Sequence, residues 1–149
     1  MFSDDRVIPQ LQQTAGGLYS VRGYRESASV GDNAVILSAE YRFHVPQIFQ
    51  PFPDPTQLFG KPFRWVPQTP QGRADWDMVL KAFIDFGHTS NNNPQLGDTN
   101  NTLVGAGLGI DLLFKRNINL RFDWGTALKD AGDTTSGSQQ FHFSVTLLY

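Results

Sequence analysis

The last eleven residues of the chain constrain its fold most strongly, because apolar and polar side chains alternate there up to a terminal aromatic residue. Leu148 is the exception among the polar positions, and the apolar set is Phe141, Phe143, Val145, Leu147 and Tyr149. In an extended strand, a period of two places the two sets on opposite faces. Such a terminal strand is typical of barrels that span an outer membrane, where the outward face meets lipid. A soluble β-sandwich shows the same alternation with its apolar face in the core, so this segment leaves both folds open.

Four further segments alternate in the same way, at residues 33–45, 78–87, 103–114 and 117–128. Each has an apolar face about 9 to 12 residues long, the length that a tilted strand needs to cross a bilayer. The opposite faces carry charged side chains, namely Glu40, Arg42, Lys81, Asp85, Asp111, Arg121 and Asp123. No helical period of useful length occurs. The sequence therefore predicts an all-β, antiparallel fold of about five strands.

The connections between these strands are unequal in length. Residues 115–117 form a tight turn, whereas residues 89–102 and 129–138 form long polar loops rich in Asn, Asp, Gly, Ser and Thr. Short turns on one side and long loops on the other are characteristic of outer-membrane barrels. The pattern predicts that residues 115–117 and Tyr149 lie on the periplasmic side and both long loops on the extracellular side.

Residues 46–77 interrupt the pattern, because they hold seven of the nine prolines. Proline removes donors from a strand ladder and favours an extended, polyproline-like backbone, so an irregular periplasmic insertion is expected here. Its aromatic residues are too numerous for a solvated linker and are expected to pack on something; they are Phe49, Phe52, Phe59, Phe63, Trp65 and Trp76. The segment is interpreted either as an ordinary structured insertion or as a docking surface for a partner.

Composition excludes several classes of function. The net charge of −2 gives no basic field for nucleic acid, and the absence of cysteine excludes a thiolate metal site. His44, His88 and His142 have no ligand-like spacing, and no catalytic set is found, so neither an enzyme nor a cofactor is predicted. The glycines at positions 105, 107 and 109 are not followed by a helix, which argues against a dinucleotide loop. They are expected to leave room for something packed against the sheet.

A series of motifs then occurs in order along the chain. Residues 16–26 read GGLYSVRGYRE and residues 31–33 read GDN; the later motifs are Glu40-Tyr41-Arg42, Phe83-Ile84-Asp85-Phe86-Gly87, Arg121-Phe122-Asp123 and the terminal aromatic strand. Together they resemble the two-partner secretion transporters of the haemolysin secretion/activation type, within the BamA-like superfamily of outer-membrane barrels. The resemblance covers the C-terminal barrel portion of that family, and residues 46–77 are the main departure from it.

This resemblance implies that residues 1–32 form a loop folded back into the barrel lumen. It implies that Arg22 reaches Asp85 on the wall, where a guanidinium and a carboxylate form a bidentate pair. The structural lumen network that it implies comprises Arg22, Gly23, Tyr24, Glu26, Glu40, Arg42, Phe83, Asp85, Gly87, Arg121 and Asp123. Its implied setting is the outer membrane, with lipid and an unfolded polypeptide client as partners.

Five strands cannot close a barrel, and an open sheet in lipid leaves edge amides and carbonyls unpaired. Residues 1–149 are therefore expected to form a partial outer-membrane barrel that is closed by further chains, identical or different, or by a longer precursor, since residues 1–5 do not resemble a secretory signal. Two roles are then expected. The protein either transports or inserts a polypeptide, or it is a membrane subunit of a multichain assembly. The family's POTRA domains have no counterpart here, which puts client capture in doubt. The competing hypothesis is a soluble β-sandwich binding module that uses residues 46–77 as its ligand surface.

Overall fold

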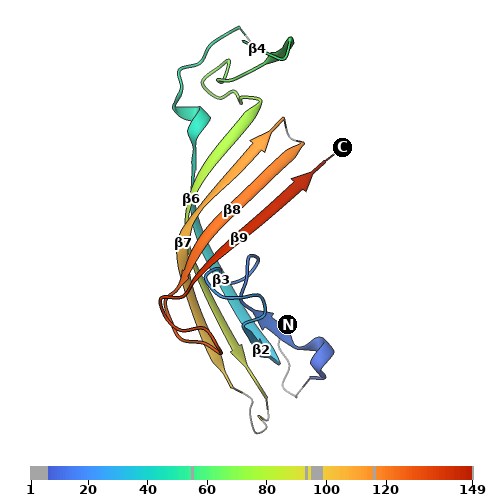
Figure 1. Ribbon diagram of the computed structural model, residues 1–149, viewed down its shortest axis with the longest axis vertical. Coiled ribbons are helices and arrows are strands. Elements are labelled where there is room, and N and C mark those ends of the chain that lie inside the picture. The colour runs from blue at the N-terminus through green and yellow to red at the C-terminus, as the bar shows by residue number, and fades with distance from the viewer. Residues whose placement is uncertain (1–6, 55, 93, 95–98, 116, 149) are drawn as a thin grey trace. The chain divides into compact units, whose positions relative to one another are not determined.

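The computed structural model describes residues 7–54, 56–92, 94, 99–115 and 117–148 (Figure 1). Strands and isolated bridges make up 55% of the described residues, which contain no α-helix. In chain order, the elements are η1 (Pro9–Leu11), β1 (Gln13–Ala15), β2 (Ser29–Gly31), β3 (Asn33–His44), η2 (Val45–Ile48), β4 (Thr56–Leu58), β5 (Lys61–Phe63), β6 (Trp76–Ser90), β7 (Asn101–Phe114), β8 (Ile118–Ala127) and β9 (Gln139–Leu147). No helix within the described ranges has the length and apolar character to cross a membrane.

The five long strands form one sheet in the order β3-β6-β7-β8-β9 (Figure 1). The all-β, antiparallel fold expected from the alternation is confirmed. Over the described residues, the edge strands β3 and β9 do not pair with each other, so the sheet is open. β6 is longer at both ends than the alternation predicted, because Trp76 and the residues after Gly87 continue the ladder. Tyr149, predicted to end the last strand at a membrane interface, lies outside the described residues.

The chain divides into two compact units, each described separately. The first comprises residues 1–40, 82–108 and 123–142, and the second comprises residues 41–81, 109–122 and 143–149.

In the first unit, β1 pairs antiparallel with β2 and closes the base of a loop at residues 16–28. This loop supplies much of the hydrophobic core of the unit, which consists of Ala15, Val21, Tyr24, Leu103, Ala127 and Ala131, with Ala28 packed against it. Val21 and Tyr24 are fully buried although both belong to the loop. The loop is therefore a packed part of the fold, held against strand residues far away in the sequence.

In the second unit, residues 46–77 are more regular than their prolines predicted. They contain η2 and the antiparallel hairpin of β4 and β5. The hairpin turns at Phe59 and Gly60, whose φ angles of 51° and 73° are both positive, as in a type I′ turn. Phe63 packs as expected of these aromatics, because its ring is buried and stacks on Phe114 with centroids 5.3 Å apart.

Some other aromatics of the segment do not pack in this way. Phe49, Phe52 and Phe59 have exposed fractions of 46%, 50% and 96%, whereas Trp65 packs edge-on against Phe63 with ring centroids 4.7 Å apart. The expectation that the aromatics pack on something is therefore met within the described residues for Phe63, Trp65 and Trp76.

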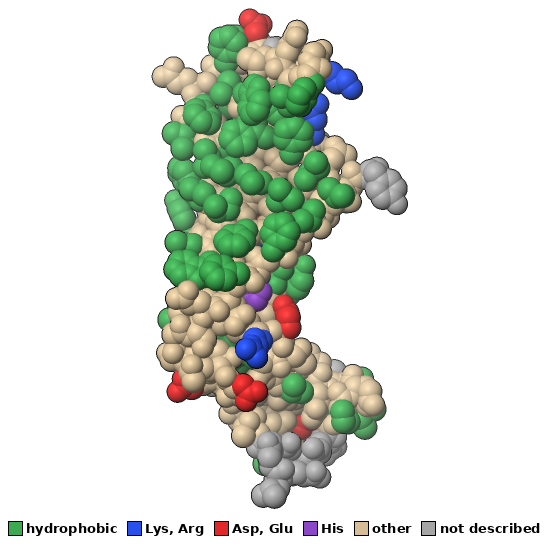
Figure 2. All heavy atoms as spheres, in the orientation of Figure 1, with side chains coloured by type: hydrophobic (Ala, Val, Ile, Leu, Met, Phe, Trp, Pro, Cys, Tyr) green, Lys and Arg blue, Asp and Glu red, His purple; other side chains and the backbone are tan. Residues whose placement is uncertain are grey.

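Polarity is inverted across the five-stranded sheet. On β6 the side chains of Lys81 and Asp85 are buried, whereas Leu80 and Ile84 between them are exposed. On β7 and β8, Asp111 and Asp123 are likewise buried between exposed apolar residues, whereas β3 and β9 hold no buried residue. Figure 2 shows hydrophobic side chains gathered over the sheet. Exposed apolar residues on these strands include Leu37, Tyr41, Phe43, Phe86, Leu108, Ile110, Leu112, Phe122, Trp124, Phe141, Phe143, Val145 and Leu147. The predicted polar faces are thus the inner ones, and the predicted apolar faces are the outer ones.

Candidate functional site

The candidate site is a buried ion cluster in the first unit, centred on Arg22 at the tip of the loop. The backbone reaches this position through a series of turns. Gly17 donates its N–H to the carbonyl of Val21 at 3.1 Å, and Gly16 donates to the Ser20 hydroxyl at 2.8 Å. Gly23, next to Arg22, has φ = 99°, a conformation that glycine adopts without the steric cost of a side chain. These turns direct the Arg22 side chain toward the inner face of β6.

Asp85 of β6 receives most of the hydrogen bonds of Arg22. Nε donates to Oδ2 at 2.7 Å and Nη2 donates to Oδ1 at 2.9 Å, which forms the bidentate fork. The backbone N–H of Arg22 also donates to Oδ2, at 3.0 Å. Arg22 is 3% exposed and Asp85 is fully buried. The contact implied by the sequence resemblance is therefore present, and the main-chain bond adds a third link.

Further groups surround the same guanidinium. Nη1 donates to Glu40 of β3 at 2.8 Å and lies 3.4 Å from Oδ2 of Asp123 on β8. Nη2 donates to the Ser38 hydroxyl at 3.3 Å, and that hydroxyl also donates to Asp85. The ring of Phe83 lies under the guanidinium, with its centroid 3.5 Å from Cζ. Residues from three strands thus surround one arginine, and aromatic stacking adds to the ionic contacts.

The protonation of Arg22 follows from these contacts. Burial opposes its positive charge, but the hydrogen bonds with Asp85 and Glu40 and the charges of Asp85 and Asp123 outweigh it and raise the pKa of Arg22. The guanidinium therefore stays charged at any pH at which the protein is folded. A neutral partner at position 85 would leave a buried cation without its bidentate acceptor.

Glycines on the sheet make room for the loop. A Cβ atom at Gly105 of β7 would overlap the carbonyl oxygen of Arg22. On β8, a Cβ atom at Gly125 would lie 2.6 Å from the backbone nitrogen of Gly23. Gly87 of β6 would place a Cβ atom 2.7 Å from Val21 Cγ2. The expectation that glycines leave room for something packed against the sheet is confirmed at Gly87 and Gly105, and the packed element is the loop.

Tyr24 and Glu26, both assigned to the network from the resemblance, hold the loop at other points. The buried Tyr24 hydroxyl donates to the Lys129 carbonyl at 2.6 Å and accepts from the Val104 N–H at 3.1 Å. Glu26 accepts from the backbone N–H of Leu18 at 2.9 Å, within the loop itself. Tyr24 therefore joins the loop to the rest of the unit, whereas Glu26 stabilises the loop internally.

Two further predicted members, Arg42 and Arg121, belong to the second unit. Arg42 forms an ion pair with Asp111 at 2.8 Å. Asp111 also meets the buried Lys81, with Nζ and Oδ1 2.7 Å apart. Arg121 is half-buried on β8, two residues before Asp123. The expected single network is thus two clusters along the polar faces of the strands.

Sequence reasoning placed Lys81 and Asp111 on the inner face without assigning them a partner, and it missed Ser38. Lys81 and Asp111 lie on the neighbouring strands β6 and β7, but which residues face one another depends on the strand pairing, which alternation alone does not give. Ser38 carries no charge to mark it. Its position two residues before Glu40 was the available signal, because residues two apart on a strand share a face.

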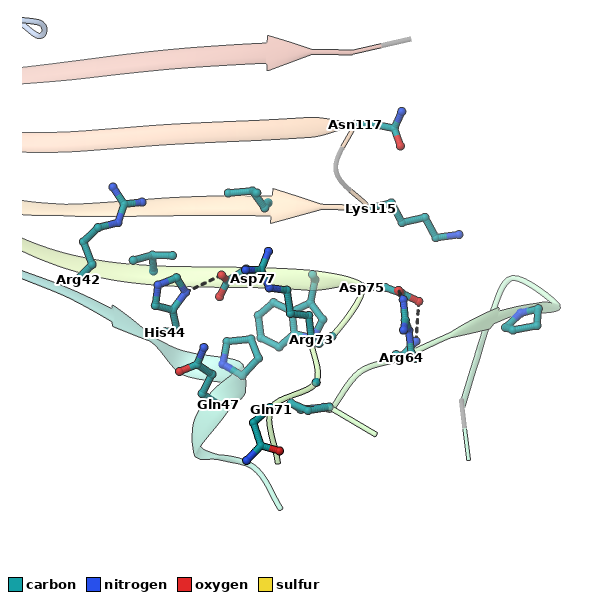
Figure 3. A pocket seen from close by; sticks show the side chains of 18 residues that line it. Arg42, His44, Gln47, Arg64, Gln71, Arg73, Asp75, Asp77, Lys115 and Asn117 are labelled. Carbon is teal, nitrogen blue, oxygen red and sulfur yellow. Dashed lines mark hydrogen bonds and ion pairs between the residues drawn. The ribbon is translucent and has the colours of Figure 1, made fainter. Parts of the chain in front are cut away.

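Apart from the ion cluster, a concavity of about 960 Å³ lies within the second unit (Figure 3). It is bordered by the 46–77 segment, the end of β3, the start of β6 and the β7–β8 turn. His44 and Asp77 form a contact of 2.6 Å in it, and Arg64 pairs with Asp75 at 2.6 Å. The Lys115 N–H donates to the Asp75 carbonyl at 2.8 Å, which holds the segment against the turn.

The hydrogen bonds of Arg64 and the charges around Asp75 affect its protonation. Burial alone would raise the pKa of Asp75, but the hydrogen bonds from Arg64 and the charges of Arg64 and Lys115 outweigh it and lower that pKa.

No group of three metal-ligating side chains gathers in the part of the chain that the structure describes. Comparisons with protein-family models, with curated proteins and with solved structures find no match to this chain.

Proposed function

We propose that this chain forms part of the wall of an outer-membrane β-barrel related to the two-partner secretion transporters, with the 16–28 loop braced against the inner face by Arg22. The observation that carries the proposal is the inverted polarity of the sheet. Charged side chains such as Lys81, Asp85 and Asp123 are buried, and the apolar residues between them are exposed. Lipid is the solvent that such an arrangement suits.

The extent of apolar exposure supports lipid contact. Soluble monomers seldom expose contiguous apolar patches of more than a few hundred Å². Here the exposed apolar positions alternate along β6, β7, β8 and β9, and Leu108, Ile84 and Phe141 reach exposed fractions of 56%, 52% and 66%. A period of two in the exposed positions is expected of a lipid-facing wall.

The soluble β-sandwich alternative fits these observations less well. A sandwich buries the apolar face of each strand against a second sheet. In the described residues the buried side of the five-stranded sheet holds Arg22, Asp85 and Asp123, and the apolar side is the exposed one. A sandwich would need a further layer over the apolar side.

The open edges determine how such a wall would be completed. β3 and β9 stand at the two edges of the sheet. Unpaired backbone groups in hydrocarbon cost several kcal/mol each, so the proposed wall requires further strands at both edges. These strands come from copies of this chain, from other chains or from a longer precursor.

Two roles remain open within this proposal. In a transporter, the loop and its ion cluster would occupy the route of the polypeptide and would have to yield to it. In a membrane subunit of a multichain assembly, the same cluster would serve only to stiffen the wall. The buried, multiply bonded state of Arg22 supports the stiffening role directly.

Trp124 offers a direct test, because it lies on the apolar face of β8 with an exposed fraction of 36%. A Trp65→Phe/Trp76→Phe variant leaves it as the single tryptophan. After reconstitution into vesicles, lipids brominated on the acyl chains should quench its fluorescence. A protein that is monodisperse without detergent and whose Trp124 emission is unaffected by brominated lipid would contradict the proposal.

A further inference from the structure

The concavity of the second unit is rich in cationic side chains. Four cationic residues line it, Arg42, Arg64, Arg73 and Lys115, against two acidic ones, Asp75 and Asp77. Histidine left aside, the cationic side chains of the lining outnumber the acidic ones by two, four minus two. An anionic ligand would meet a favourable field there.

Several of these charges are already paired. Arg42 pairs with Asp111, Arg64 pairs with Asp75, and His44 contacts Asp77 (Figure 3). These contacts fix the walls of the concavity. They leave other donors for a ligand.

The side chains of Arg73, Gln47 and Gln71 supply those donors. All three line the concavity and are exposed, and no hydrogen bond or ion pair of theirs is found among the described residues. A guanidinium and two carboxamides together offer a planar fork and two further N–H groups, which suits the oxygen atoms of a phosphate. Lys115, at the β7–β8 turn, adds positive charge at the border of the same concavity.

Exposed aromatic side chains belong to the same segment. Phe49, Phe52 and Phe59 have exposed fractions of 46%, 50% and 96%. Phe59 stands at the hairpin tip with φ = 51°, a conformation that is costly for a residue other than glycine and that occurs preferentially at functional positions. A segment that carries both cationic side chains and exposed phenylalanines suits the boundary between lipid headgroups and acyl chains.

We propose that this concavity binds the phosphate of an anionic phospholipid through Arg73, Gln47 and Gln71, while the exposed phenylalanines of residues 46–77 enter the acyl boundary. The inference rests on the proposed membrane function and deepens it, because it gives the irregular insertion a lipid ligand. A ligand that carries both a phosphate and acyl chains uses both features of the segment, whereas a free phosphate would leave the phenylalanines without a role.

The test compares two fluorescent phospholipids, one with an anionic phosphatidylglycerol headgroup and one with a zwitterionic phosphatidylcholine headgroup. Both are titrated onto the purified protein in detergent micelles. The wild type should bind the anionic lipid more tightly, and Arg73→Gln should weaken that binding roughly fivefold, as expected for the loss of one basic contact. Arg25→Gln is the matched control, because it removes an exposed arginine from the loop of the first unit and should leave binding unchanged.

A Gln47→Ala/Gln71→Ala variant provides a second measure that keeps every charge, and it should also weaken binding of the anionic lipid. Equal binding of both lipids, or unchanged binding in both variants, would overturn the inference. Displacement of the anionic lipid by an equal concentration of inorganic phosphate would overturn it too, by showing a site for a free anion. Quenching of Trp124 by brominated lipid is measured in parallel on the Trp65→Phe/Trp76→Phe variant. If quenching persists without a headgroup preference, this inference alone fails; if quenching is also absent, the proposed function fails as well.

Discussion

Arg22 donates three hydrogen bonds to the carboxylate of Asp85, two from its guanidinium and one from its own backbone N–H. The backbone bond matters because the arginine side chain is flexible. Hydrogen bonds from the guanidinium alone would still allow the backbone of the loop to move relative to β6. With both kinds of bond, the main chain of the loop is tied to β6 as well as the side chain. The loop and the strand are thus joined at a buried point.

A double-mutant cycle measures this link. Arg22→Ala and Asp85→Ala should each lower the free energy of unfolding by about 3 to 5 kcal/mol, because each leaves a buried charge without its partner. The double variant should lose much less than the sum of the two. Urea unfolding in detergent micelles supplies the values.

The exposed pair of Arg64 and Asp75 is the control for that cycle, since its geometry is equally close. Its removal should cost about 0 to 1 kcal/mol, because solvent screens the two charges. Strictly additive losses for Arg22 and Asp85 would argue against a coupled pair.

Gly105→Ala should displace the loop without changing any polar group. The added methyl overlaps the Arg22 carbonyl oxygen, so we expect a destabilisation of about 1 to 3 kcal/mol, as for overpacked sites. Trypsin should then cleave after Arg22, which is buried in the wild type. Gly60→Ala is the comparison, because a methyl there meets nothing within 4 Å and only the backbone is strained. Cleavage after Arg22 in Gly60→Ala, or no cleavage after Arg22 in Gly105→Ala, would contradict this explanation.

Tyr24→Phe removes one hydroxyl that bonds to the backbone at Val104 and Lys129. Because the groups left behind are partly buried, the expected loss is about 1 to 3 kcal/mol of unfolding free energy. Tyr19→Phe should change it by less than about 0.5 kcal/mol, since Tyr19 is 82% exposed. Chemical denaturation of the two variants side by side distinguishes them, and equal losses would argue against a role for the Tyr24 hydroxyl.

Acid should weaken the contact between Asp75 and Arg64 in the 46–77 segment. The pKa of Asp75 in the folded protein lies below its ordinary value of 3.8, so its contact with Arg64 stabilises the segment above that pH. This stabilisation is lost as the pH falls through the folded pKa. The fluorescence of Trp65 and Trp76 should report the transition, and Asp75→Asn should abolish it. The Arg22 guanidinium stays charged throughout this range, so an identical transition in Asp75→Asn would point to another carboxylate.

The sequence predicted the five long strands and which face of each is polar, because a period of two is a strong signal and each strand carries it. The predicted contact of Arg22 with Asp85 came from the motif resemblance and is present in the structure. The division of the charged residues into two clusters could not be predicted. Glu40 and Arg42 lie on the same face of β3, and only the residues opposite them, Arg22 for Glu40 and Asp111 for Arg42, assign them to different clusters. The β4–β5 hairpin was missed because Phe59 occupies a turn position that normally holds asparagine or glycine.

The position of the Arg22 guanidinium has a consequence for how the strands are aligned. Its partners Glu40, Asp85 and Asp123 come from β3, β6 and β8. The contacts of one side chain therefore depend on the register of three strands. If one of these strands slipped by one residue, its carboxylate would turn to the opposite face of the sheet and an apolar side chain would face the arginine. The contacts of Arg22 with all three carboxylates therefore depend on the observed alignment of the three strands.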